Sequence, residues 1–156
     1  MKKINFLKLI IALLIPQAAG LLGSLATMPN IAGWYAGLVK PSFNPPNWIF
    51  GPVWTILFVL MGVALYLVWI DKNNIKQTAY LFFVLQLIFN ILWSYLFFAL
   101  HNPFIAFLLI IFLWILILLN IIYFYKINKI AGWLLAPYIF WVSFALVLNY
   151  YIFILN

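Results

Sequence analysis

The chain has 156 residues, of which 70% are hydrophobic and 6% are charged, and its formal net charge is +7. Its mean hydropathy is +1.22. A soluble domain of this length cannot bury so much apolar surface, so the composition excludes soluble globular folds and indicates a protein that lies in lipid. Cysteine is absent, which excludes disulfides and thiol chemistry.

The lipid environment restricts the fold to helices or a closed barrel, because backbone groups in a bilayer must be hydrogen-bonded within the protein. Barrel strands alternate apolar and polar residues, whereas the run 104–119 is continuously apolar. The sequence therefore predicts an all-α integral membrane protein, with one bundle of transmembrane helices in a single domain over residues 1–156. Five segments reach the length of about 20 residues that a bilayer requires: 4–26, 48–70, 78–99, 103–125 and 131–154.

The first segment has a second interpretation. Lys2, Lys3 and the apolar run 7–15 resemble a secretory signal, with a cleavage site after Ala26. The apolar stretch nevertheless continues to Leu25, which is long enough to span a bilayer, and we expect the helix to be retained. Small residues spaced four apart allow another helix to approach closely, either within the chain or in a homodimer: Ala19 with Gly23, and Gly20 with Ser24.

The distribution of charge predicts the orientation. With five helices, the N-terminus and the second and fourth loops share one side of the membrane. The other side carries Lys40 alone, whereas this side carries the remaining lysines: Lys2, Lys3, Lys8, Lys72, Lys76, Lys126 and Lys129. The positive-inside rule places the N-terminus in the cytoplasm and the C-terminus outside, and we expect a bacterial cell membrane. Topology explains the positive net charge, so no binding to nucleic acid is predicted.

The loop between the first two segments is the most unusual part of the sequence. Residues 34–54 read WYAGLVKPSFNPPNWIFGPVW, which is rich in proline and tryptophan. A plain connection between two membrane helices needs only a few polar residues. Because proline stiffens the backbone, this loop predicts a rigid cover over a functional cavity.

Ionisable groups are nearly absent from the spans. Only Lys8, near the end of the first segment, is charged within one of them. Ion pumps and proton-coupled transporters normally need buried ionisable groups, so these functions are disfavoured. One histidine and one aspartate cannot supply a metal site or a hydrolytic triad, so we predict no metal. We interpret His101 as a loop residue at the membrane interface, with ligand binding or proton transfer as the alternative.

Uncharged polar residues gather on the third segment. Gln86, Asn90 and Ser94 follow at intervals of four residues and form one stripe, with Trp93 beside it. Amides in a membrane span usually face other protein, so Gln86 is either a helix-packing residue or a pocket residue. For Asn90 we favour a pocket role, because Trp93 and Ser94 give it a mixed polar and aromatic setting.

Helix lengths place several candidates in the outer half of the membrane, beneath the proline-rich loop. At about 1.5 Å per residue, Asn90 lies past the middle of its segment. Trp54 and Asn149 lie near the outer ends of theirs, and Trp141 lies about halfway along the fifth. A cavity with this lining suits a flat, largely apolar, aromatic ligand. Tetrapyrroles fit this description and sterols fit almost as well, so the chemistry alone does not choose between them.

Three blocks carry a resemblance to a known family. They read WYxxLxKPxxxPP from Trp34, followed by Phe50 and Trp54; QLxxNxxWSxxFF from Gln86; and AGWLLxPYxxW from Ala131, with Asn149 later. In this order they resemble the TspO/MBR family, which comprises the tryptophan-rich sensory proteins and the mitochondrial translocator protein. The resemblance covers essentially the whole chain.

The resemblance implies a five-helix bundle, often a homodimer, that binds porphyrins and synthetic benzodiazepine-receptor ligands in a pocket under the first loop. It implies no required cofactor besides porphyrin as the ligand. Phe58 stands where relatives often carry tyrosine, which removes one hydroxyl from the pocket wall. The ligand-binding positions that it implies are Trp34, Tyr35, Pro45, Trp54, Phe58, Asn90, Trp93, Ser94, Trp141 and Ala145.

Three functions are consistent with this resemblance. The one we favour is a membrane-embedded sensor or scavenger that binds a tetrapyrrole of the protoporphyrin IX or haem type. The second is a light- and oxygen-dependent porphyrin-degrading enzyme, in which Trp54 and Trp141 would be catalytic. The third is a passive transporter of porphyrins or sterols. No basic residue follows Tyr150 and Tyr151, so the C-terminal sterol motif is absent.

Overall fold

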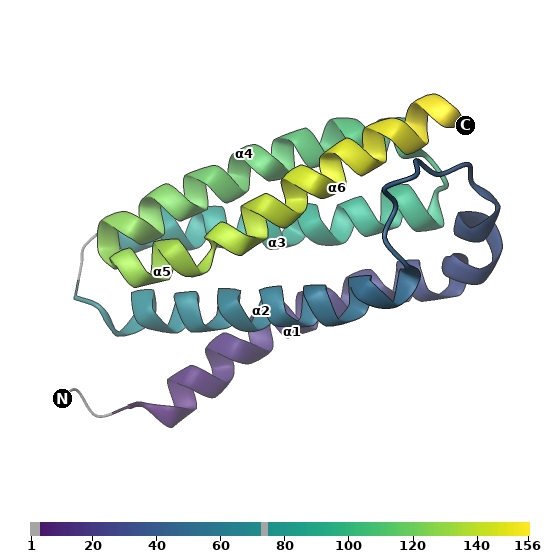
Figure 1. Ribbon diagram of the computed structural model, residues 1–156. Helices are drawn as coiled ribbons and strands as arrows, with labels where there is room; N and C mark the ends of the chain where they lie inside the picture. The colour runs from purple at the N-terminus through teal and green to yellow at the C-terminus, as the bar shows by residue number, and fades with distance from the viewer. Residues whose placement is uncertain (1–3, 73–74) are drawn as a thin grey trace.

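The computed structural model describes residues 4–72 and 75–156. Its five apolar spans run side by side in one bundle (Figure 1), and no strand occurs among the residues that it describes. The prediction of an all-α membrane protein with five spans is confirmed. The spans cover Phe6–Tyr35, Asn47–Ile70, Lys76–Ala99, Pro103–Ile127 and Lys129–Leu155.

Three of the five spans are composed of two helical elements each. The first joins α1 (Phe6–Asn30) to a π-helical turn, η1 (Ile31–Tyr35), and the third joins α3 (Lys76–Ser94) to the π-helical turn η2 (Tyr95–Ala99). The second and fourth spans are the single helices α2 (Asn47–Ile70) and α4 (Pro103–Ile127). The fifth consists of α5 (Lys129–Leu134) and α6 (Ala136–Leu155).

The first and fifth spans differ most from the predicted ones, and the ends of the other three agree to within two residues. The first span continues past residue 26, where the side chains of Thr27 and Asn30 donate to carbonyls of the preceding turn and the backbone then widens into η1. The fifth span is interrupted at Leu135. Pro137 explains the interruption, because it has no N–H to donate to the carbonyl four residues earlier. Asn102 and Asn128 cap the following helices by accepting from Ile105 N and Ala131 N.

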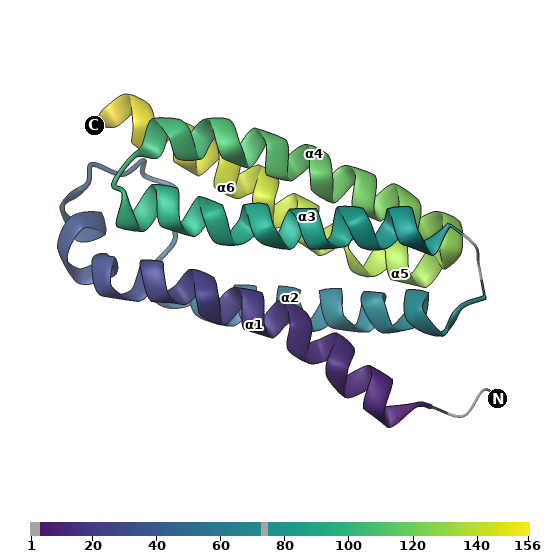
Figure 2. The ribbon, with the colours of Figure 1, turned by 180° about the vertical axis from the view of Figure 1, so that it is seen from behind.

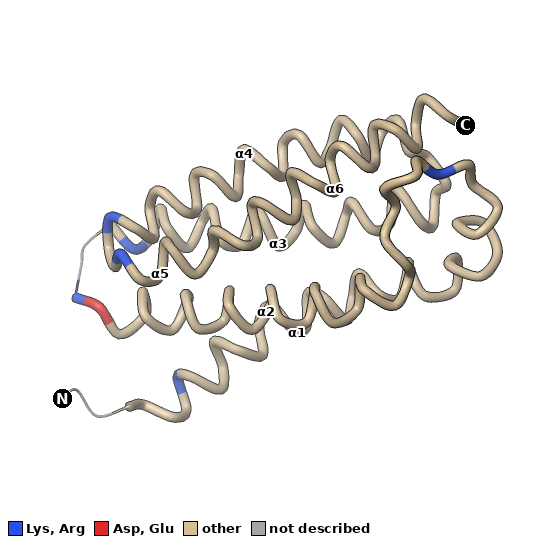
Figure 3. Tube along the Cα trace, viewed as in Figure 1, with Lys and Arg blue, Asp and Glu red and all other residues tan. Residues whose placement is uncertain are grey.

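The lysines distinguish the two ends of the bundle (Figure 3). Lys40 lies in the loop 36–46, at the end of the bundle that we call the outer end. The other described lysines lie at the opposite, inner end: Lys8, Lys72, Lys76, Lys126 and Lys129.

Small residues let the helices approach closely within the chain. A Cβ placed on Gly62 of α2 would lie 2.7 Å from Leu13 Cα, and one on Gly23 of α1 would lie 3.1 Å from Ser94 Oγ of α3. Seen from behind, α3 runs between α1 and α4 (Figure 2). The small residues of the first span therefore serve packing inside the chain, and the homodimer stays a prediction of the resemblance.

Buried apolar side chains fill the inner half of the bundle. Met61 and Val68 of α2 are completely buried, and Phe83 of α3 stacks on Phe124 of α4 with ring centroids 5.6 Å apart. Asn120 is buried among them and donates to the carbonyl of Ala79. Helices α2, α3 and α4 are therefore packed towards the inner end, where the start of α1 diverges from them (Figure 2).

Candidate functional site

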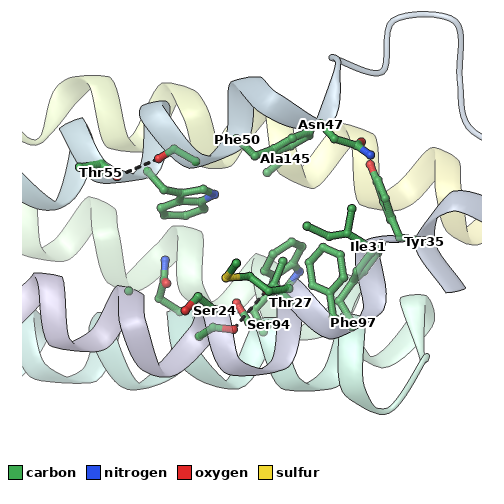
Figure 4. Close-up of a pocket in the computed structure, with 18 of the residues that line it drawn as sticks. Ser24, Thr27, Ile31, Tyr35, Asn47, Phe50, Thr55, Ser94, Phe97 and Ala145 are labelled. Carbon is green, nitrogen blue, oxygen red and sulfur yellow. Dashed lines mark hydrogen bonds between the residues drawn. The ribbon is translucent and has the colours of Figure 1, made fainter. Parts of the chain in front are cut away.

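A cavity lies in the outer half of the bundle, bounded by α1, η1, α2, α3, η2 and α6. Its volume is about 470 Å³. Figure 4 shows Ser24, Thr27 and Ser94 on one side of it, Phe50 and Thr55 on the opposite side, and Tyr35 and Phe97 towards the outer end. Its wall combines aromatic rings and aliphatic side chains with several amides and hydroxyls.

The structure brings eight of the ten predicted ligand-binding residues to this cavity, although they come from four separate elements. Their role in binding stays a prediction. The residues in the wall are Tyr35, Trp54, Phe58, Asn90, Trp93, Ser94, Trp141 and Ala145.

The other two predicted residues, Trp34 and Pro45, are not part of the cavity wall. Trp34 faces the outer corner of the bundle, where its ring stacks on His101 at a centroid distance of 4.5 Å and an interplanar angle of 12°. His101 has a positive φ of 51°, and its Nε2 lies 3.1 Å from Asn30 Oδ1. Pro45 lies in the loop, where its carbonyl accepts from Asn44 Nδ2. Both residues therefore lie at the outer end of the bundle and outside the cavity wall.

A buried hydrogen-bond chain forms the floor of the cavity at its inner end. Asn90 Nδ2 donates to the hydroxyl of Tyr138 at 3.1 Å, and that hydroxyl donates to Gln86 Oε1 at 2.9 Å. Gln86, Asn90 and Tyr138 are all buried, at 0%, 6% and 1% exposure. Of the three, only Asn90 reaches the cavity. The polar stripe of the third segment thus divides into a packing residue, Gln86, and wall residues, Asn90 and Ser94.

A second polar chain stiffens the wall beside α6. Trp93 Nε1 donates to Asn149 Oδ1 at 2.9 Å, and Asn149 Nδ2 donates to the carbonyl of Pro103 at 2.8 Å. Trp93 also stacks on Phe97 with centroids 5.3 Å apart. One asparagine therefore joins α3, α4 and α6, and it holds the Trp93 ring in a fixed orientation.

The two tryptophans of the photochemical hypothesis are held differently. Trp54 stacks on Phe58 at 5.5 Å and meets Tyr138 edge-on at 6.1 Å. Trp141 contacts the ring of Phe50, at 5.8 Å, and that of its helix neighbour Phe144. Among the described residues neither indole N–H has a hydrogen-bond partner, although both side chains line the cavity.

The loop 36–46 covers the outer end and is attached at several points. Tyr35 Oη donates to Asn44 Oδ1 at 2.9 Å. Phe43 packs edge-on against Tyr151 of α6, with centroids 5.3 Å apart. The ammonium of Lys40 lies 4.7 Å from the ring centroid of Tyr35, within reach of a cation–π interaction. These contacts hold the loop against Tyr35 and α6 at the outer end, and its role as a cover over a binding cavity stays a prediction.

The first helix contributes a part of the wall that the sequence reasoning missed. Gln17, Ser24 and Thr27 line the cavity, and Gln17 Nε2 donates to the carbonyl of Thr55 across the α1–α2 contact at 3.3 Å. The signal was present in the sequence, because Gln17, Gly20, Ser24, Thr27 and Ile31 recur at intervals of three or four residues. This spacing marks one face of a helix.

The cavity also reaches the lipid-facing surface between α1 and α2. Leu21 and Met28 of α1 and Trp48 of α2 belong to its lining, yet their side chains are 70%, 70% and 73% exposed. In a bilayer these side chains meet acyl chains. The cavity is therefore open to the surface of the bundle between α1 and α2.

Comparison with known proteins agrees with this arrangement. The model of the TspO/MBR family matches residues 12–155. The chain is 44% identical to the tryptophan-rich protein TspO of Archaeoglobus fulgidus over 156 residues, which cover 97% of this chain and 99% of the relative. It is 46% identical to the protein of the same name from Chlorobaculum tepidum, over 89% of each chain. It is 31% identical to the translocator protein of Sus scrofa, over 88% of this chain and 83% of the relative. The chain therefore belongs to the TspO/MBR family.

Proposed function

We propose that the protein binds a flat, largely apolar tetrapyrrole of the protoporphyrin IX or haem type in the outer cavity, and that it acts as a sensor or scavenger of this ligand. The observation that carries the proposal is the cavity wall, which includes the rings of Trp54, Trp93 and Trp141 around about 470 Å³. Pockets for small molecules typically measure about 300–1,000 Å³. Burial between aromatic rings supplies the affinity, and the few polar groups orient the ligand.

The test is a titration of protoporphyrin IX into the detergent-purified protein in the dark, followed by tryptophan fluorescence. We expect saturable quenching, with Trp54→Phe and Asn90→Ala weakening affinity by roughly threefold to tenfold, as expected for loss of one stacking or polar contact. Trp133→Phe is the matched control, because Trp133 is 69% exposed on α5 at the inner end. Equal, unsaturable quenching in every variant would mean that porphyrin only partitions into the micelle.

A second candidate function is light-dependent degradation of the bound porphyrin. It is favoured by the position of Trp54 and Trp141, two oxidisable indoles that both line the cavity with their N–H groups unpaired among the described residues. Illumination of the titrated samples under oxygen distinguishes this function from binding alone. More than one molecule of a defined product per protein, abolished by Trp54→Phe or Trp141→Phe, would establish turnover. A single event that damages the protein would leave it a binder.

Passive transport has less support. The buried side chains of the inner half, such as Met61, Val68 and Phe124, leave the cavity confined to the outer half of the bundle. A route through the centre of the bundle would require these helices to separate. Flux of protoporphyrin into protein-containing liposomes, above that of empty liposomes, is the measurement that would favour transport over binding.

The orientation that we propose has the N-terminus in the cytoplasm of a prokaryotic cell and the C-terminus outside. It is supported by the lysines at the inner end, opposite Lys40. The chain contains no cysteine, so single cysteines can report on each side. Ser42→Cys in the loop should react with an impermeant maleimide in intact cells, and Lys129→Cys should react only after lysis. The reverse pattern would overturn the proposed orientation.

A further inference from the structure

The floor of the cavity contains a hydrogen-bond chain whose two ends are left unpaired. At the deep end, Gln86 Nε2 is buried and has no partner among the residues that the structure describes. At the cavity end, Asn90 Oδ1 accepts no hydrogen bond from the described residues, yet it is not sealed from the cavity. The hydroxyl of Tyr138 lies between the two carboxamides and bonds to both.

The same three side chains can also form two hydrogen bonds with every donor and acceptor role along the hydrogen-bond chain reversed. If both carboxamides turn over, Gln86 Nε2 donates to the Tyr138 oxygen, and the Tyr138 hydroxyl donates to Asn90 Oδ1. A tyrosine hydroxyl both donates and accepts, and the two ends of a carboxamide have nearly the same shape. No other heavy atom has to move.

The two directions differ only at the ends of the chain. As observed, Asn90 presents its carbonyl oxygen to the cavity, and Gln86 leaves an N–H donor unpaired. In the reversed direction, Asn90 presents its NH₂ group, and Gln86 leaves a carbonyl oxygen unpaired. Buried unpaired N–H groups are rarer in proteins than under-satisfied carbonyl oxygens. The reversed direction is therefore not disfavoured at the deep end, and a ligand at the cavity end can decide between the two.

We propose that Gln86 and Tyr138 are positioning residues that set the hydrogen-bonding specificity of the cavity through Asn90, in a relay that reverses to match the ligand. The inference rests on the proposed function, since it needs a ligand in the cavity. A ligand whose deepest edge carries an N–H or O–H group meets the Asn90 oxygen. A ligand whose deepest edge carries an acceptor meets the Asn90 NH₂ group. The cavity thus accepts flat apolar ligands of either kind.

Three flat tricyclic probes separate these cases in the detergent-purified protein. Carbazole carries an N–H donor, acridine carries a ring-nitrogen acceptor, and anthracene carries neither. We expect the wild-type protein to bind carbazole and acridine with similar affinity, each about fivefold tighter than anthracene, which is the effect of one net hydrogen bond. Asn90→Leu should bind all three probes equally.

Replacing Gln86, at the deep end, should then fix the hydrogen-bond chain in one direction. In Gln86→Leu the Tyr138 hydroxyl loses its deep acceptor and donates instead to Asn90 Oδ1, so that NH₂ faces the cavity. This variant should keep acridine affinity and lose carbazole affinity by about fivefold. Tyr138→Phe removes the hydroxyl that links Asn90 to Gln86, and it should make the affinities for carbazole and acridine similar again. Asn120→Leu removes a buried amide away from the cavity, and it should leave the carbazole-to-acridine ratio unchanged.

The outcomes test the reversible relay separately from the proposed binding function. A wild-type preference for carbazole that Gln86→Leu does not alter would mean that the relay has one fixed direction, and it would overturn the inference while leaving the cavity a binding site. An unchanged ratio in all the variants would show that Asn90 does not contact the probes, with the same consequence. Failure of all three probes to bind a protein that still binds protoporphyrin IX would overturn the inference alone, and failure of protoporphyrin IX to bind as well would remove the proposed function with it.

Discussion

Asn156 and Val39, which are 117 residues apart in the chain, form a reciprocal pair of hydrogen bonds. Val39 N donates to Asn156 Oδ1 and Asn156 Nδ2 donates to the carbonyl of Val39, both at 3.0 Å. The side chain of Asn156 thus pairs with the backbone of the covering loop as a neighbouring strand would. It also donates to the carbonyl of Ile152 in α6. The loop is in this way joined to the fifth span.

We expect Asn156→Ala to release the loop without unfolding the bundle. The bonds are exposed, so the loss of free energy of unfolding should be only about 1 kcal/mol or less. Hydrogen exchange at the Val39 amide should rise, and a ligand in the cavity should dissociate faster. Asn156→Asp is the control, because it keeps an acceptor for Val39 N and should protect that amide partly. Unchanged exchange at Val39 in Asn156→Ala would show that the aromatic contacts alone hold the loop.

Adding a methyl group to two glycines of the bundle should have unequal effects on stability. A Cβ on Gly62 would lie within 2.9 Å of backbone atoms of Ala12 and Leu13, whereas a Cβ on Gly20 would meet only the ring of Phe58, at 2.4 Å. A ring can rotate away but a helix backbone cannot. We expect Gly20→Ala to lower the free energy of unfolding by roughly 1–3 kcal/mol and Gly62→Ala to lower it further. Thermal unfolding in detergent measures both.

The matched control for these glycines is Gly33→Ala in η1, where a Cβ would meet nothing within 4 Å. Its stability should be unchanged or slightly raised. In addition, Gly20→Ala should displace the Phe58 ring towards the cavity and weaken porphyrin binding, whereas Gly62→Ala should not affect affinity in the fraction that remains folded. Equal binding in both variants would contradict this assignment of Phe58.

Removal of Asn149 should destabilise three helices at once. Asn149→Leu leaves Trp93 Nε1 and the carbonyl of Pro103 without their partners. Each buried polar group that loses its partner costs about 1–3 kcal/mol, so we expect a clear fall in the thermal midpoint. The control is Asn5→Leu, which removes an exposed N-cap bond to Lys8 N at the inner end and should cost about 1 kcal/mol. A smaller effect for Asn149→Leu than for Asn5→Leu would show that water replaces the lost bonds.

Substitutions of Trp34 and Trp54 should affect thermal stability and porphyrin affinity differently, although both residues belong to the same proline-rich segment. Trp34 is not itself in the cavity wall and packs against His101 and behind Phe97 and Phe98, so Trp34→Leu should lower the thermal midpoint and leave porphyrin affinity largely unchanged. Trp54→Leu should do the reverse, because its ring lines the cavity. A fall in affinity for Trp34→Leu at unchanged stability would instead support the direct ligand contact that the family resemblance implies.

The sequence alone determined the class, the number of spans and the distribution of charge between the two ends. These properties follow from composition and local pattern: a continuous apolar run must be helical in lipid, and lysines interrupt the runs mostly on one side. The proline-rich loop and the stripe of Asn90 and Ser94 also pointed to the outer half before any contact was known. Local pattern was less informative at the ends of helices, where Thr27 and Asn30 bond to backbone carbonyls and Pro137 removes one backbone hydrogen bond.

Only the tertiary structure decided which of the candidate residues face the cavity. Trp34 and Tyr35 are adjacent in the sequence, yet one stacks on His101 outside the cavity wall and the other lines the cavity, because side-chain direction depends on how the π-helical turn η1 packs against η2. The partner of Gln86 could not be read from the sequence either, since Tyr138 is 52 residues away. Contacts between distant helices depend on their relative rotation, and an apolar sequence that is hydrophobic all around each helix contains little information about that rotation.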